Sequence, residues 1–143
     1  MLRPGRARGK LVGGNLTLIA TLCGTKWQLK TENKILLLED VREKIYSIDR
    51  LICQLKASGL LENPAAVILG SWKECKTSLK NSLTLEEVFT HYFGDAPYPV
   101  IKNFPSGHDK YQTAIPLNLM AEIDTEAMQV LLLESAVSSS VIR

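Results

Sequence analysis

The chain has 143 residues, a length that suits one domain with a sizeable core. Hydrophobic residues make up 45% and charged residues 22%, the balance of an ordinary globular protein. The net charge of +2 is too small to indicate a nucleic-acid partner, and no apolar run reaches the ~18 residues that a membrane span needs.

Three cysteines, Cys23, Cys53 and Cys75, are spaced like neither a zinc site nor a redox motif. Reduced, mostly buried thiols in a cytoplasmic protein are the favoured interpretation. With only two histidines in the chain, the sequence predicts no metal site and no cofactor.

Residues 1–10 are basic and are predicted to be a flexible or truncated start. Asn15 can cap a short helix over Leu16–Leu22, with Gly24 after its end. A basic start before an apolar stretch resembles a signal peptide, but Gly13-Gly14 and Asn15 separate the two parts and favour the helix. The glycine pair could bind an anion, but it lacks the lysine of a phosphate loop, so a tight turn is favoured.

The stretch that follows carries the first functional candidate. Four apolar residues, Ile35 to Leu38, predict a buried strand, and Glu39 lies at its end. Asp40 and Glu43 have the spacing of a capping box, which predicts a helix directly after the strand. Apolar residues recur at helical spacing from there to Leu55, and Gly59 would end the helix. Ligand and catalytic groups collect at the carboxyl ends of strands, and a helix start favours an ionised carboxylate, so Glu39 is singled out.

The second half predicts one more helix and several strands. Residues 65–69 form a buried strand, Thr84–Glu87 has capping-box spacing and opens a helix to Phe93, and 100–101 is a short strand. Three extended segments are expected at 113–117, 119–124 and 128–133, and a disordered tail at 135–143. This order predicts a mixed α/β domain with a parallel and an antiparallel sheet portion.

His108 is the second functional candidate. It follows Ser106 and a glycine in a loop with proline and aromatic neighbours, whereas His91 lies in a predicted helix and is expected to be a surface or packing residue. A histidine base usually works with a carboxylate that orients it, a part that Glu39 could take. Neither Ser106 nor Ser71 lies in a nucleophile motif, so the residues alone offer a base and its orienter without an attacking group.

Four stretches resemble one family in order and spacing. They are Gly9–Leu16 (GKLVGGNL), Leu36–Leu55 (LLLEDVREKIYSIDRLICQL), Phe104–His108 (FPSGH) and Ile115–Leu117 (IPL). Together they resemble the C-terminal half of the LD-carboxypeptidases, in the serine peptidase family that also holds the microcin C immunity peptidases. The resemblance assigns a domain over residues 11–134.

The resemblance implies a swivelling β/β/α-type fold and a serine–histidine–glutamate triad in which His108 is the base and Glu39 orients it. The nucleophilic serine would belong to an N-terminal flavodoxin-like domain outside this chain. The implied reaction is hydrolysis of the amide between an L-centre and a terminal D-alanine of murein peptides, in bacterial cytoplasmic peptidoglycan recycling. Enzymes of this family are often homodimers, which makes a second copy an expected partner, with no membrane or nucleic acid.

The sequence departs from the family pattern at Arg42, where glycine is usual, and at Tyr111-Gln112 and Asn118. Three other interpretations stay open. One is a catalytically inactive module that binds a peptide or a partner chain, and the second is a fragment of a microcin-immunity-like peptidase. The third is a metal hydrolase that uses Glu39, Asp40 and His108.

Overall fold

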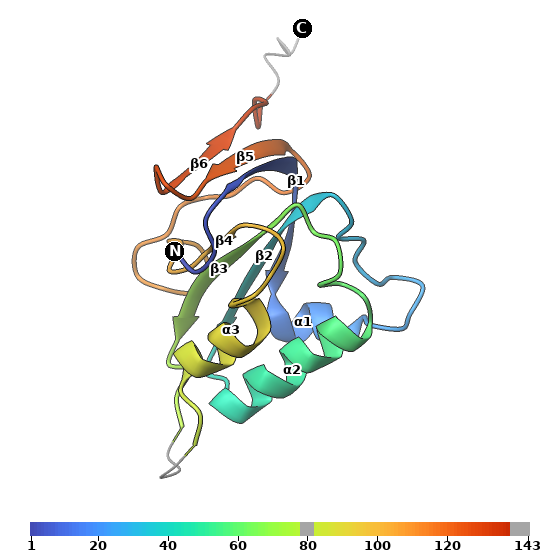
Figure 1. The fold of residues 1–143 in the computed structure, drawn as a ribbon, viewed down its shortest axis with the longest axis vertical. Coiled ribbons are helices and arrows are strands. Elements are labelled where there is room, and N and C mark those ends of the chain that lie inside the picture. Colours follow the sequence, from blue (N-terminus) through green and yellow to red (C-terminus); the bar gives the residue numbers. More distant parts are fainter. Residues whose placement is uncertain (78–81, 138–143) are drawn as a thin grey trace, which may run out of the picture.

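A computed structural model describes residues 1–77 and 82–137. Figure 1 shows its elements, which in chain order are β1 (Arg6–Asn15), α1 (Leu16–Thr21), β2 (Lys34–Val41), α2 (Ile45–Ala57), β3 (Ala66–Lys73), α3 (Leu85–Phe93), β4 (Val100–Ile101), β5 (Met120–Asp124) and β6 (Gln129–Leu132). The strands form one sheet in the order β4-β3-β2-β1-β5-β6. The first four strands are parallel and the last two are antiparallel, which confirms the mixed α/β prediction.

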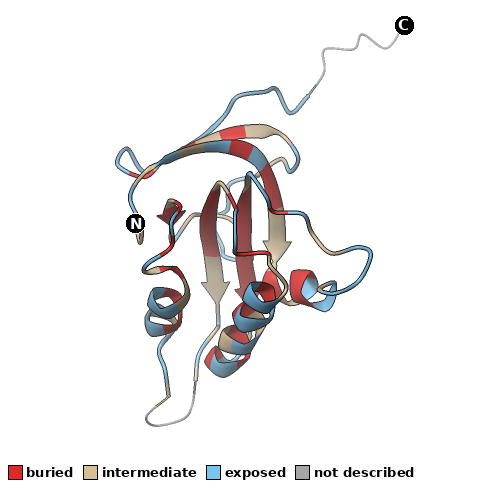
Figure 2. Ribbon diagram, turned by 45° about the vertical axis from the view of Figure 1, so that its right-hand side comes forward, coloured by how far each residue is buried: buried red, intermediate tan, exposed pale blue. Residues whose placement is uncertain are grey.

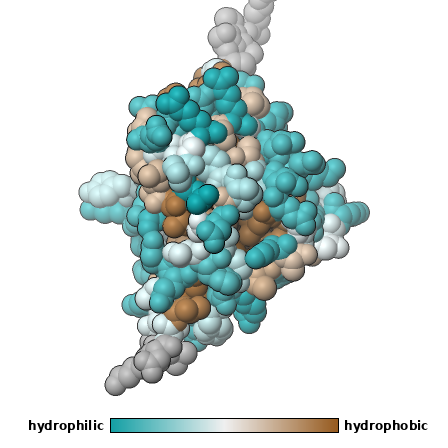
Figure 3. All heavy atoms as spheres, in the orientation of Figure 1, coloured by the Kyte–Doolittle hydropathy of each residue, from teal (hydrophilic) through white to brown (hydrophobic). Residues whose placement is uncertain are grey.

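The sheet separates two apolar clusters. The three helices gather on one side, where Leu36 and Leu38 of β2 pack in a cluster with Ile48 and Ile52 of α2 (Figure 1). The alternate β2 residues, represented by Leu37, join the second cluster with residues of β1 and of the curved β5 strand. Buried residues accordingly run through the central strands in Figure 2, and hydrophilic residues cover most of the face seen in Figure 3. Side chains of one strand thus serve both faces in strict alternation.

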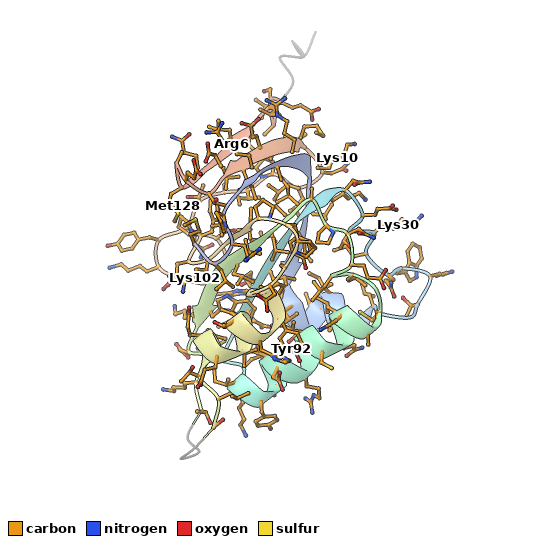
Figure 4. All side chains as sticks on the ribbon, viewed as in Figure 1. Arg6, Lys10, Lys30, Tyr92, Lys102 and Met128 are labelled. Atoms are coloured by element: carbon orange, nitrogen blue, oxygen red, sulfur yellow. The ribbon has the colours of Figure 1, made fainter. Side chains whose placement is uncertain are left out.

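Local capping signals set two of the helix starts. Asn15 caps α1, since its Oδ1 accepts the Leu18 amide proton at an N···O distance of 3.1 Å. In α3, Thr84 and Glu87 form both bonds of the predicted capping box, which confirms that prediction. Tyr92 joins α3 to α2 by donating its hydroxyl proton to the Asp49 carboxylate at 2.9 Å (Figure 4).

The capping box predicted for the second helix is wrong. The strand β2 runs on to Val41, and α2 begins only at Ile45, with Lys44 as an N-cap that makes no side-chain bond. Asp40 caps α1 instead: its Oδ2 accepts the amide and hydroxyl protons of Thr17 at 3.0 and 2.9 Å. Its Oδ1 accepts from the Asn15 side-chain amide at 2.9 Å. The sequence spacing was misleading because β1–β2 pairing carries the carboxylate to a helix that precedes it in the chain.

Three further predictions need correction or fall outside the structure. Residues 1–10 are not a flexible start, since Arg6–Lys10 form the first half of β1 and Arg3 bridges to β4. The segment 113–117 is irregular rather than extended in a sheet. In the predicted disordered tail, residues 135–137 are exposed, and 138–143 lie outside the described residues.

The cysteines are free, as the sequence predicts, although Cys53 is exposed and the other two are half-buried. Desolvation by burial raises the pKa of the Cys75 thiol, which favours its protonated form. Within residues 1–77 and 82–137, no helix has the length and apolar character that crossing a membrane requires.

Replacing Asp40 by alanine is expected to lower the free energy of unfolding by about 3 kcal/mol. The Asp40 residue is only 2% exposed, and its loss leaves half-buried donors on Asn15 and Thr17 without their acceptor. Urea denaturation measures the change. The exposed Asp95→Ala is the matched control, expected within about 0.5 kcal/mol of the wild type. Equal stability of the two variants would contradict the capping role.

Candidate active site

The first predicted site residue, Glu39, lies near the carboxyl end of β2 beside an irregularity in the sheet. Leu38 pairs with Leu69 and Asp40 pairs with Trp72, so two residues of β3 stand opposite Glu39 alone. Such a bulge bends a strand and re-aims side chains, and bulges are frequent next to active sites. The helix-dipole argument for Glu39 is wrong, because α2 begins six positions later, at Ile45.

The second predicted site residue, His108, belongs to a loop that is bonded to the bulged end of β3. The Phe104 amide donates to the Leu69 carbonyl at 3.1 Å, and the Ser71 amide donates to the Ser106 carbonyl at 2.8 Å. The His108 amide then donates to the Ser71 hydroxyl oxygen at 3.0 Å. The two main-chain bonds continue the pairing of β3 beyond β4, and the bond to the Ser71 side chain holds the next part of the loop against the strand.

The structure brings Glu39 and His108 together across 69 positions of sequence. Glu39 Oε2 lies 2.7 Å from His108 Nδ1. The Glu39 side chain is 7% exposed, whereas the His108 side chain is 50% exposed. A carboxylate accepts hydrogen bonds, so the tautomer that fits this contact has its proton on Nδ1, and in that tautomer Nε2 is an unprotonated acceptor.

This arrangement can act as a general base. The buried carboxylate fixes the ring orientation and its tautomer, and it would stabilise the imidazolium that forms when Nε2 takes a proton. No group within the described ranges is bonded to Nε2, and the half-exposed ring leaves that atom accessible to a reacting group.

Two glycines that the sequence analysis did not single out as site residues allow this close approach. A Cβ on Gly107 would lie 2.3 Å from Ser71 Oγ and 2.7 Å from Glu39 Oε2, and the Gly107 φ of +132° disfavours any other residue. A Cβ on Gly70 would lie 2.5 Å from the Ser106 carbonyl oxygen. The Gly-His dipeptide could be recognised in the sequence. The need for glycine could not, because the atoms that a Cβ would meet belong to strands far away in the sequence.

The remaining candidates lie away from this pair. Asp40 faces the helix side of the sheet, because consecutive strand residues point to opposite faces. It therefore does not lie with Glu39 and His108, as the metal-hydrolase hypothesis requires. In the part of the chain that the structure describes, no three His, Cys, Asp or Glu residues are placed to hold a metal. His91 is exposed on α3, and its ring packs edge-on against Tyr92.

A pocket of about 680 Å³ opens next to the loop that carries His108, and Ser71 and Phe104, which bond that loop to β3, are among its lining residues. It lies between the exit of β3, the start of α3 and the loop that carries His108. Its lining mixes aromatic and acidic side chains, among them Trp72, Phe89, Glu86, Asp109 and Tyr111. The volume is in the usual range for a small-ligand site.

Residues 8–123 match the LD-carboxypeptidase C-terminal domain. The chain belongs to this family. The murein tetrapeptide carboxypeptidase of Pseudomonas aeruginosa is 34% identical over 120 residues, which cover 83% of this chain and 39% of that protein. The chain spans less than half the length of the curated relatives it matches.

Solved structures of family members have the same fold. The muramoyltetrapeptide carboxypeptidase from Oxalobacter formigenes superposes with a TM-score of 0.79 at 31% identity, over 88% of this chain and 45% of that one. The microcin C7 self-immunity protein MccF superposes with a TM-score of 0.82 at 26% identity, over 94% of this chain and 40% of that one. The expected resemblance to LD-carboxypeptidases and microcin immunity proteins is confirmed.

The departure at Arg42 has a structural counterpart. Arg42 has a φ of +60°, a left-handed conformation that glycine adopts without cost, and it lies three residues after Glu39. Its guanidinium pairs with Glu74 at 3.0 Å, which links the ends of β2 and β3. The chain thus keeps the backbone conformation that suits glycine, while the Arg42 side chain pairs with Glu74 at the exposed ends of the two strands.

Replacing Gly107 by alanine is expected to detach the loop from β3, since the added methyl group meets both Ser71 and Glu39. Amide hydrogen exchange at Phe104 and Ser71 should accelerate at least about tenfold, because strain at such a position costs roughly 1–3 kcal/mol before the collision is added.

Gly14→Ala is the matched control for this experiment. Gly14 has a similar φ of +136°, but nothing lies within 4 Å of a Cβ built there. Exchange at Phe104 and Ser71 should stay at the wild-type rate in this variant. Slow exchange at these amides in Gly107→Ala would contradict the tight packing of the loop.

Proposed function

We propose that this chain supplies the glutamate and the histidine of a serine–histidine–glutamate triad in an LD-carboxypeptidase. The observation that carries the proposal is the 2.7 Å contact between buried Glu39 and half-exposed His108 at the carboxyl edge of the sheet. The nucleophilic serine would lie on an N-terminal flavodoxin-like domain, in keeping with the greater length of the relatives.

In the proposed reaction, His108 Nε2 takes the proton of the serine hydroxyl as its oxygen attacks the amide carbonyl. Glu39 stabilises the resulting imidazolium. The imidazolium then gives the proton to the leaving amine, and D-alanine departs from an acyl-enzyme. Water, activated by the same Nε2, hydrolyses the acyl-enzyme and restores the serine.

The proposed substrate is a murein peptide that ends in D-alanine after an L-centre. The names of the Pseudomonas and Oxalobacter relatives specify murein tetrapeptide and muramoyltetrapeptide carboxypeptidases, which supports this choice. We place the reaction in cytoplasmic recycling of peptidoglycan fragments.

Microcin-type immunity is the second candidate. MccF has been solved with glutamyl sulfamoyl guanosine, and its structural likeness to this chain is as close as that of the carboxypeptidase. Its sequence is 28% identical, however, against 34% for the Pseudomonas enzyme. Hydrolysis of an aminoacyl sulfamoyl nucleoside without release of D-alanine would favour this alternative.

The isolated chain is expected to release no D-alanine from murein tetrapeptide, because acyl transfer has no attacking group without the serine. Amino-acid analysis of the reaction mixture measures the product. Release of D-alanine by the pure chain would contradict the proposed division of the triad between two domains.

Grafting the chain onto the N-terminal half of the Pseudomonas enzyme, in place of its own C-terminal domain, is expected to restore D-alanine release. In this chimaera, His108→Ala should lower kcat about 10⁶-fold, as loss of the triad histidine does elsewhere. His91→Ala removes the other histidine, which is exposed, and should leave kcat unchanged. A folded chimaera whose activity survives His108→Ala would refute the proposal.

A further inference from the structure

We infer that Ser71 is a positioning residue of the proposed site, which holds the main chain of His108 so that the imidazole stays on Glu39. The hydroxyl of Ser71 accepts the His108 amide proton at 3.0 Å. The inference deepens the proposed function, on which its catalytic meaning rests, but the contact itself belongs to the folded chain.

Ser71 is attached to the loop twice. Its own amide donates to the Ser106 carbonyl at 2.8 Å, while its hydroxyl receives the amide of His108, two residues further on. A strand residue usually offers only main-chain bonds to its neighbour. Here the side chain supplies a second bond, which reaches the catalytic candidate itself.

The bulge explains why a side chain takes this part. Two β3 residues stand opposite Glu39, and Ser71 is the second of them. The loop turns at Gly107, whose φ of +132° brings its Cα close to both the Ser71 hydroxyl and the Glu39 carboxylate. The Ser71 hydroxyl and the Glu39 carboxylate therefore flank one glycine, the first bonded to the main chain of His108 and the second to its ring.

This geometry excludes the nucleophile role that the sequence left open for Ser71. The hydroxyl bonds the main chain of His108, and no bond joins it to the imidazole in the described residues. A base needs a hydroxyl within reach of the ring nitrogen that is free to accept its proton. Ser71 is instead placed to limit how far His108 can move away from the carboxylate.

The test uses the 143-residue chain labelled with ¹⁵N. In Ser71→Ala, the His108 amide should exchange about tenfold faster, the usual effect of losing one such hydrogen bond. The ring ¹⁵N shifts should also move from the Nδ1-protonated tautomer of the wild type toward a mixture of both tautomers. A residue with only a general packing role would not change the tautomer.

Two further variants keep the experiment decisive. Ser71→Thr retains the hydroxyl and should keep the wild-type exchange rate and ring shifts. Ser106→Ala removes a neighbouring hydroxyl that bonds no other described residue, and it should also match the wild type. The inference would be overturned if Ser71→Thr or Ser106→Ala changed the exchange rate of the His108 amide and the ring ¹⁵N shifts. It would also be overturned if both stayed at their wild-type values in Ser71→Ala.

The proposed function can fail separately. If the wild-type ring is not protonated at Nδ1, the Glu39–His108 pair itself is wrong. If the wild type has the expected tautomer and Ser71→Ala keeps it, only the role of Ser71 is wrong.

Discussion

Two adjacent carboxylates on β2 have different tasks because a strand points consecutive side chains to opposite faces. Asp40 turns to the helix side and caps α1, while Glu39 turns to the other side and meets His108. The parallel pairing of β1, β2 and β3 fixes both placements at once. A shift of the register by one residue would exchange the two carboxylates and destroy the cap and the site together.

The Glu39–His108 pair has the geometry that the proposed base and its orienting carboxylate require, and its contribution to stability is small by comparison. A carboxylate that is 7% exposed has lost most of its hydration, and burying an ionised group is costly without a partner. The partner it has is a half-exposed imidazole whose second nitrogen is bonded to no described residue. Buried charged groups with a single, partly exposed partner are frequent in active sites, where packing elsewhere in the fold offsets the free-energy cost of desolvation.

Much of the fold follows from the sequence because its signals are local. Apolar runs and helical spacing predict the central strands and helices, and Thr84–Glu87 caps its helix as predicted. The start of α2 could not be predicted this way. The spacing of Asp40 and Glu43 suggests a local cap, but Asp40 accepts hydrogen bonds from the start of α1, which is distant in the sequence. The same limit applied to residues 1–10, whose strand depends on pairing with β5.

The candidate site likewise contains residues that the sequence could predict and residues that it could not. Glu39 and His108 could be singled out by residue type and neighbours, and the family resemblance gave each a role. The supporting residues could not, because the need for glycine at position 107 arises from Ser71 and Glu39, which lie 36 and 68 positions earlier in the chain. Ser71 itself lies in no motif, and its contact with the main chain of His108 depends on the bulge in β3.

A double-mutant cycle on Glu39 and His108 in the chimaera tests the central claim most directly, with kcat for D-alanine release as the measured quantity. Residues that act as one unit give strongly non-additive losses. The account predicts that Glu39→Gln and His108→Ala combined lower kcat no further than His108→Ala alone. Losses that multiply would mean that the two side chains act independently, and would contradict the proposed dyad.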